Sequence, residues 1–167
     1  MQSFHIPQGL HIRPSTASDN PFLEQLYRAT REDLQAIDGE RDFIESIIEM
    51  QFQAQSQGYG ADYPNAMYFI IEKHQEKIGK VTIDFGHNEA HLLDIAFLPK
   101  ARDHGFGKAI IQSFQNAAAQ SRVPMSLTVF KDNLAAQKLY TSLGFVAEEY
   151  REPYYRMCWY PTLEMMT

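Results

Sequence analysis

Residues 102–108 read Arg102-Asp103-His104-Gly105-Phe106-Gly107-Lys108. An apolar run at 92–98 precedes this stretch and predicts a strand, while the run at 109–119 that follows it predicts a helix. Two glycines separated by one residue let the backbone turn sharply and approach a ligand closely. The first N–H groups of a helix have no partner within the helix, and the helix dipole attracts anions to that end. The stretch therefore predicts a phosphate-binding loop.

Two widespread glycine-rich loops do not fit this stretch. A Walker P-loop requires a glycine where Arg102 stands, and it requires serine or threonine where Ala109 stands. A Rossmann fingerprint requires a third glycine three residues after Gly107, and Ile110 occupies that position. The pattern Arg-x-x-Gly-x-Gly after an apolar strand fits at every position.

Composition narrows the class of protein. A chain of 167 residues, 44% hydrophobic and 22% charged, predicts one soluble globular domain over 1–167. The net charge of -6 disfavours nucleic acid as a partner, because neutralising phosphates requires a basic surface. No apolar run approaches the roughly 18 residues of a membrane span, and no secretory signal is visible. The single cysteine, Cys158, predicts a reducing, cytoplasmic setting and a strand residue rather than a nucleophile.

The remaining patterns give the order of elements: strand, two helices, three strands, helix, strand, helix, two strands. The first helix is expected to begin at Asn20-Pro21, with Asn20 as its cap. This order predicts an α+β fold of the mixed α/β kind, with a central mixed twisted sheet of about six to seven strands and helices on both faces. The expected elements are strands 10–13, 68–72, 80–85, 125–130, 145–149 and 154–159, helices 20–34, 43–52 and 134–143, and a connection at 74–77.

A second block lies downstream of the glycine loop. It contains Asn-x-x-Ala-x-x-Leu-Tyr from Asn133 to Tyr140, followed by Gly144-Phe145. With the two blocks in this order, the chain resembles the GNAT superfamily of acyl-CoA-dependent N-acetyltransferases. The paired motifs span residues 92–145, about a third of the chain. The expected order of elements matches the family along nearly the whole chain.

The resemblance implies acetyl-CoA as the acyl donor. Main-chain N–H groups of residues 104–108 would bind its pyrophosphate, the Phe106 side chain would point away, and nearby cationic side chains would add positive charge. A bulged strand before the loop would pair with the pantetheine arm. Asn133 would cap the next helix and contact the cofactor. The implied cofactor-binding residues are Ile95, Phe97, Leu98, Arg102, His104, Gly105, Phe106, Gly107, Lys108, Asn133 and Ala136.

The resemblance assigns Tyr140 as the proton donor to the leaving thiolate. A phenol has an ordinary pKa of about 10 and a thiol of about 8.5, so Tyr140 is protonated at neutral pH and can donate a hydrogen bond or a proton to the leaving sulfur; packing of Tyr140 on the sheet is the other interpretation. Thr128 stands where some family members carry a glutamate base. Asp94 is the first alternative, because an acidic residue in an apolar strand is costly to bury unpaired, although a hydrogen bond to a neighbouring loop would also explain it. Glu72 and Asp84 are further candidates.

The resemblance implies an N-acetyltransferase that moves an acetyl group from acetyl-CoA to a primary amine of a small molecule or peptide by direct attack. A non-catalytic acyl-CoA-binding module and a transferase of longer acyl chains are the alternatives. Tyr27, Arg31 and Tyr59 are candidates for the acceptor channel. No metal site is expected, because His87 and His91 flank a turn and a strand. The exposed C-terminal strand would allow a homodimer.

Overall fold

The computed structural model describes residues 6, 9–30, 50, 52 and 63–166. These residues form one seven-stranded sheet in the order β1-β2-β3-β4-β5-β7-β6, in which β4 and β5 are parallel and all other neighbours are antiparallel. The sheet confirms the α+β class and the mixed strand directions. The strands are β1 (Leu10–Pro14), β2 (Met67–Lys73), β3 (Glu76–Phe85), β4 (Ala90–Phe97), β5 (Met125–Phe130), β6 (Val146–Arg151) and β7 (Tyr154–Trp159); the α-helices are α1 (Asn20–Thr30), α4 (Phe106–Gln120) and α5 (Leu134–Ser142).

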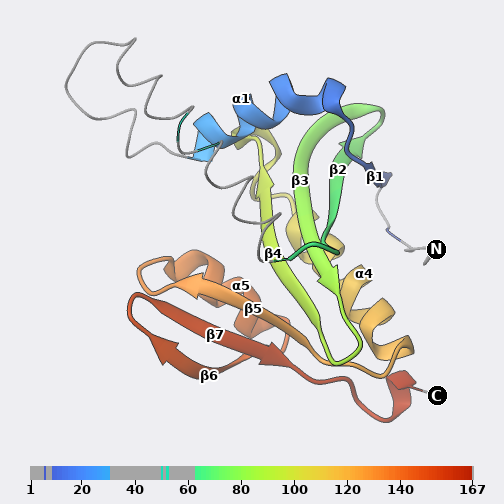
Figure 1. The fold of residues 1–167 in the computed structure, drawn as a ribbon, viewed down its shortest axis with the longest axis vertical. Helices are drawn as coiled ribbons and strands as arrows, with labels where there is room; N and C mark the ends of the chain where they lie inside the picture. The colour runs from blue at the N-terminus through green and yellow to red at the C-terminus, as the bar shows by residue number, and fades with distance from the viewer. Residues whose placement is uncertain (1–5, 7–8, 31–49, 51, 53–62, 167) are drawn as a thin grey trace.

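Helices cover both faces of the β1–β4 half of the sheet. Helix α4 lies behind these strands in Figure 1, and its buried Phe114 contacts the rings of Phe69 and Phe85. Because side chains alternate along a strand, Lys80 on β3 points to the face opposite Phe85. Helix α1, which contacts β3 and β4, shares a cleft with Lys80 and therefore lies on that opposite face.

The parallel strands β4 and β5 pair over only three residues. Ala90–Leu92 align with Met125–Leu127, and beyond this point the two strands separate, as Figure 1 shows. The register between β3 and β4 shifts between Thr82 and Ile83, so that Leu93 is an extra residue in β4. Such a bulge bends a strand and increases its twist. The bulge lies in the strand where the family resemblance implied one.

The start of the first helix differs from the prediction. The chain is already helical at the 3-10 turn Ala17–Asp19, and Asn20 has helical dihedral angles instead of serving as a cap. The Asp19 carboxylate accepts a hydrogen bond from the Thr16 N–H at 2.8 Å, so this pair begins the helical segment. The predicted helix 43–52 lies outside the described residues except for Met50 and Phe52, as does the part of 20–34 beyond Thr30.

The connection between β2 and β3 is also shorter than predicted. Its turn consists of His74 and Gln75, whose φ angles are 49° and 70°. Two successive residues in this region form the turn that suits the twist of a hairpin. Neither is glycine or asparagine, which explains why the sequence did not reveal so tight a turn.

One buried carboxylate ties the N-terminal elements to the β2–β3 hairpin. Asp19 is fully buried and accepts two hydrogen bonds from the Arg13 guanidinium, at 2.8 and 2.9 Å. The Lys77 ammonium lies 2.8 Å from the same carboxylate, and Arg13 also contacts Glu72 at 3.1 Å. These hydrogen bonds hold the pKa of Asp19 well below its usual range. The network joins β1 and the 3-10 turn that precedes α1 to β2 and β3.

We expect Asp19→Asn to destabilise the fold by about 3 kcal/mol at neutral pH, because it leaves the cations of Arg13 and Lys77 beside an uncharged amide. The ionised Asp19 stabilises the fold fully above its unfolded pKa of about 3.9, and this contribution is lost as the pH falls below that value. The stability gap between wild type and variant should therefore shrink on acidification. Chemical denaturation at several pH values measures it.

Glu24→Gln is the matched control, because Glu24 makes a partly exposed ion pair with Arg28 at 2.8 Å. Such pairs contribute about 0.5 kcal/mol. A stability gap for Asp19→Asn that does not change with pH would contradict the role assigned to its charge.

Candidate active site

A cleft of about 910 Å³ lies where β4 and β5 separate. Its walls come from α1, β3, β4, the glycine loop, the first turn of α4 and the helix α5. Leu98 and His104 are the two residues of the predicted site that do not line it. The predicted residues that do line it are Asp94, Ile95, Phe97, Arg102, Gly105, Phe106, Gly107, Lys108, Asn133, Ala136 and Tyr140.

The glycine loop presents unpaired main-chain donors to this cleft. Gly105 immediately precedes α4 and adopts the left-handed conformation, with a φ of 79° and a ψ of 8°. The carbonyl of Gly105 accepts a hydrogen bond from the Ala109 N–H at 3.1 Å, which closes the first turn of the helix. The N–H groups of Phe106, Gly107 and Lys108 precede that bond and so have no acceptor within the helix. This geometry suits an anion.

The Phe106 side chain anchors the loop. It is buried and contacts the Phe97 ring, with the ring centres 6.4 Å apart. The His104 ring stacks on it at 5.4 Å, and the Lys73 ammonium lies 4.5 Å from its centre. Phe106 thus points its ring at the protein, while its main chain stays at the cleft.

The main chain of β4 is open toward the cleft. The Leu98 N–H donates to the Ile78 carbonyl of β3 at 2.8 Å, and main-chain groups of alternate residues in an antiparallel pair face the partner. Ile95 and Phe97 therefore direct their N–H and C=O groups away from β3, into the gap left by β5. Arg102 donates from Nε to the Phe97 carbonyl at 3.1 Å, which fixes the loop to the end of the strand.

Helix α5 supplies the opposite wall. The Asn133 side chain accepts a hydrogen bond from the Ala136 N–H at 3.1 Å, which confirms the predicted cap. Tyr140 lines the cleft, and its ring meets Phe145 edge-on at 5.9 Å. Burial, with a smaller contribution from the Asp94 carboxylate, raises the pKa of Tyr140 to about 12. The phenol therefore keeps its proton at neutral pH.

Asp94 has a partner that the sequence did not reveal. Its carboxylate lies 2.8 Å from the Lys80 ammonium, and both residues line the cleft. The side chains are 22% and 13% exposed, so each charge is largely removed from water and needs the other. The pair is diagonal across β3 and β4, and only the strand register could have predicted it.

The other candidate residues lie elsewhere or remain outside the described part. Glu72 binds Arg13 at 3.1 Å, and neither Glu72 nor Asp84 lines the cleft. Thr128 is exposed on β5, opposite Arg156. Tyr27 does line the cleft. Residues 31 and 59, also considered for the acceptor channel, are not among the described residues.

His91 and Cys158 are packed inside the protein. His91 is buried, its Nδ1 lies 2.7 Å from Ser126 Oγ, and its ring stacks on Tyr63. Cys158 is buried on β7, and burial raises the pKa of its thiol. Within the described ranges, no three His, Cys, Asp or Glu side chains are grouped to hold a metal ion. No helix in those ranges is long and apolar enough to cross a membrane.

Comparisons with known proteins agree with this geometry. The model of the acetyltransferase (GNAT) family matches residues 23–145. The PaiA N-acetyltransferase of Thermoplasma acidophilum, solved with coenzyme A, shares 17% identity at a TM-score of 0.70, covering 92% of this chain and 99% of that one. The ribosomal-protein-S18-alanine N-acetyltransferase of Escherichia coli shares 17% at 0.66, covering 92% and 95%. A spermidine N-acetyltransferase chimera of Vibrio cholerae SpeG and hSSAT shares 21% at 0.60, covering 92% and 96%. No curated protein matches the chain.

We expect Asp94→Asn to lower the pKa of Tyr140 from about 12 while leaving it above the ordinary phenol value of about 10, because burial is the larger cause. Ultraviolet titration of the phenolate, with the Tyr140→Phe trace subtracted, measures this pKa. Asp84→Asn, on β3 outside the cleft, is the control. If Tyr140 of the wild type titrated at the ordinary phenol pKa of about 10, this would contradict the burial of its hydroxyl group in the cleft.

Proposed function

The chain belongs to the acetyltransferase (GNAT) family, and we propose that it is an N-acetyltransferase that moves an acetyl group from acetyl-CoA to a primary amine of a small molecule or peptide. The amine attacks directly, without an acyl-enzyme. One observation carries the proposal: free first-turn amides of α4, the open main chain of β4 and the protonated Tyr140 all border the same cleft.

The cleft fits an acyl-CoA at its phosphate end. The N–H groups of Phe106, Gly107 and Lys108 would bind the pyrophosphate, and Arg102 and Lys108 add positive charge at the cleft. His104 would contribute through the main chain. The N–H and C=O groups of Ile95 and the N–H group of Phe97 would pair with the amide-bearing arm, because the Phe97 carbonyl already accepts a hydrogen bond from Arg102. Leu98, Asn133 and Ala136 would border this arm.

Gly107 gives an independent sign of a ligand. A Cβ at this position would lie 3.5 Å from the Phe97 ring and 3.9 Å from Leu139, which are ordinary contact distances. The φ of Gly107 also lies outside the left-handed region. The fold itself therefore accepts alanine here, and the glycine is explained by a ligand that comes close to the main chain.

Tyr140 is proposed as the acid. A bound acyl-CoA supplies an activated acyl carbon and a thiolate leaving group. A thiol has an ordinary pKa of about 8.5, whereas Tyr140 holds its proton up to about pH 12. The phenol can therefore donate a hydrogen bond to the departing sulfur throughout the physiological range, and proton transfer accompanies C–S cleavage. General acid catalysis of this kind contributes about 10²–10⁴ to the rate.

Asp94 is proposed to receive the amine. Two acidic residues of the described chain line the cleft, Asp94 and Asp103. Asp103 is exposed in the glycine loop, whereas Asp94 lies close enough to Tyr140 to raise its pKa. Asp94 would orient the amino group and take up its proton, directly or through water.

A second function has one observation in its favour. Because Asp94 is engaged by Lys80 at 2.8 Å, the cleft could bind acyl-CoA without promoting transfer, as a non-catalytic module. Mass spectrometry of products from an amine panel, with acetyl-CoA and longer acyl-CoAs as donors, separates the functions. A protein that binds acetyl-CoA tightly but acetylates no amine in the panel would be such a module.

We expect Gly107→Ala to weaken coenzyme A binding at least about tenfold, or about 1.4 kcal/mol, because the added methyl narrows the space between Phe97 and Leu139. The melting temperature of the free protein should not fall. Calorimetric titration and thermal unfolding check the two statements. Gly86→Ala, in the turn between β3 and β4, is the matched control. Unchanged affinity in Gly107→Ala would place the diphosphate elsewhere.

We expect Tyr140→Phe to lower kcat by about 10²-fold or more and to change coenzyme A affinity by less than about threefold, because the hydroxyl acts on the leaving group. Steady-state kinetics and calorimetry measure these quantities. Tyr154→Phe, which removes an exposed hydroxyl on β7, should leave both unchanged. Full activity in Tyr140→Phe would remove the tyrosine from the mechanism.

A further inference from the structure

The charges that line the cleft fall into two groups. Arg102, Asp103 and Lys108 belong to the glycine loop and the first turn of α4, at the phosphate end. Lys80 and Asp94 lie on β3 and β4, where the side chains face α1. Asp94 precedes Phe97 by three residues, so about 10 Å of strand separates the pair from the loop. Acyl transfer as described above uses Asp94 but gives Lys80 no part.

Lys80 and Asp94 compensate each other in a poorly hydrated place. Their charged atoms lie 2.8 Å apart, and the side chains are 13% and 22% exposed. Removing one partner from such a pair leaves the other charge buried and unpaired, which is the costly arrangement. An acceptor that binds Asp94 must therefore also compensate the positive charge of Lys80.

A simple amine that lacks a carboxylate would bind poorly next to the Lys80 ammonium. An ammonium group that binds Asp94 displaces Lys80 and places a second positive charge beside it, so that like charges repel. A molecule that carries a carboxylate close to its amino group avoids the conflict, because it offers each member of the pair an opposite charge. The Lys80 ammonium can move aside because its four-carbon side chain is flexible. Asp94 has a short side chain on the bulged strand β4, so its carboxylate stays in place.

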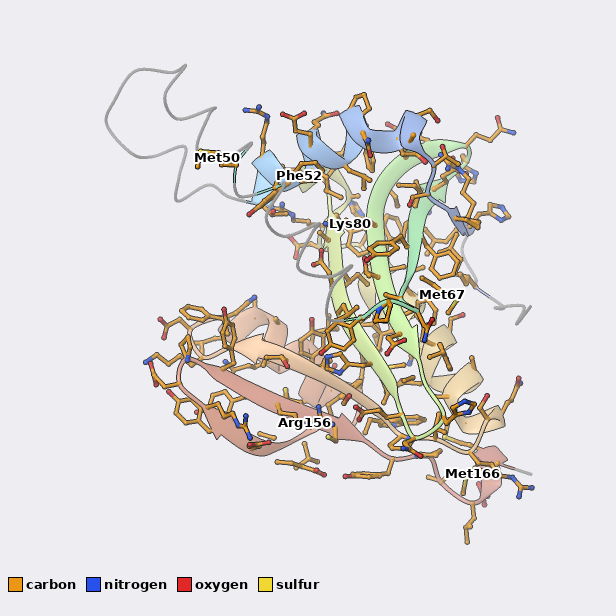
Figure 2. The ribbon with its side chains drawn as sticks, viewed as in Figure 1. Met50, Phe52, Met67, Lys80, Arg156 and Met166 are labelled. Atoms are coloured by element: carbon orange, nitrogen blue, oxygen red, sulfur yellow. The ribbon has the colours of Figure 1, made fainter. Side chains whose placement is uncertain are left out.

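The wall opposite this pair suits the rest of such a molecule. Leu26, Tyr27 and Ala29 of α1 line the cleft with largely apolar surface. Figure 2 shows Lys80 beneath α1, on the side of the sheet that this helix covers. An apolar wall next to a paired cation and anion matches an aliphatic or aromatic side chain attached to a zwitterion.

We propose that the acceptor is a free amino acid, bound with its carboxylate on Lys80 and its amino group between Asp94 and Tyr140. The inference rests on the N-acetyltransferase function proposed above. The amine nitrogen forms the bond to the acyl carbon as the C–S bond breaks. The ammonium loses two protons in all: one replaces the proton that Tyr140 gives to the sulfur, and the other leaves through Asp94 to water. Lys80 is a specificity-determining residue that holds the carboxylate.

Matched acceptors test this assignment. Alanine and alaninamide differ in the carboxylate, as do phenylalanine and phenethylamine. The wild type should show kcat/KM at least about tenfold higher for each amino acid than for its partner without a carboxylate, which corresponds to one charge-assisted contact. Lys80→Gln should bring this ratio close to one, mainly through KM, and Lys80→Arg should keep most of it. Lys131→Gln, which removes an exposed cation outside the cleft, should change nothing.

Two outcomes overturn the inference. Wild-type protein that prefers phenethylamine or alaninamide excludes a carboxylate site, and this result does not depend on the folding of any variant. A Lys80→Gln protein that loses activity equally on all acceptors shows that Lys80 only supports the fold or Asp94.

Binding separates this inference from the proposed reaction. Calorimetric titration of each acceptor into the complex with coenzyme A needs no turnover. If no acceptor is acetylated but phenylalanine binds in a Lys80-dependent way, the reaction fails and the zwitterion site stands. If amines are acetylated without regard to the carboxylate, the reaction stands and the zwitterion site fails.

Discussion

The separation of two parallel strands organises this protein. Strands β4 and β5 share three residue pairs and then part, β4 remaining with β3 and β5 with β7. In a continuous sheet the main-chain groups of Ile95 and Phe97 would pair with β5, and here they face a cleft instead. The bulge at Leu93 bends β4 at the start of this separation. Because β4 leads into the glycine loop and α4, the separation of the strands places the first-turn amides of α4 next to the unpaired edge of β4.

Electrostatics divides the cleft into two ends with different tasks. At the loop end, helix-terminal amides and two cationic residues favour an anion in a protein whose net charge is -6. At the inner end, the charges of Lys80 and Asp94 cancel, and the half-buried phenol of Tyr140 remains protonated. A donor with a diphosphate and an acceptor with balanced charges would each find one end that suits it.

The sequence predicted those features that depend on neighbours along the chain. The glycine loop, the Asn133 cap and the helix that ends before Gly144 each follow from a few adjacent residues, and the structure has all three. Features that depend on distant pairing were not predictable. The Lys80–Asp94 pair requires the register of β3 on β4, and the Asp19 network requires Lys77 to reach a carboxylate that lies 58 positions earlier in the chain. The Asn20 cap was wrong because the chain is already helical from Ala17, where the Asp19 carboxylate accepts the hydrogen bond from the Thr16 N–H.

The three-residue seam between β4 and β5 also bears on how the molecule opens. Few main-chain hydrogen bonds join the β1–β4 half of the sheet to the β5–β7 half, and α4 and the buried side chains carry the rest of the contact. The two halves are therefore natural candidates for separate cooperative units in amide hydrogen exchange, with β5, β6 and β7 exchanging together. A ligand that binds between β4 and β5 would contact both units at once, so its binding would protect the amides of both units from exchange. Occupancy of the cleft would then slow exchange as far away as β6, which lies at the edge of the sheet and contributes no residue to the cleft.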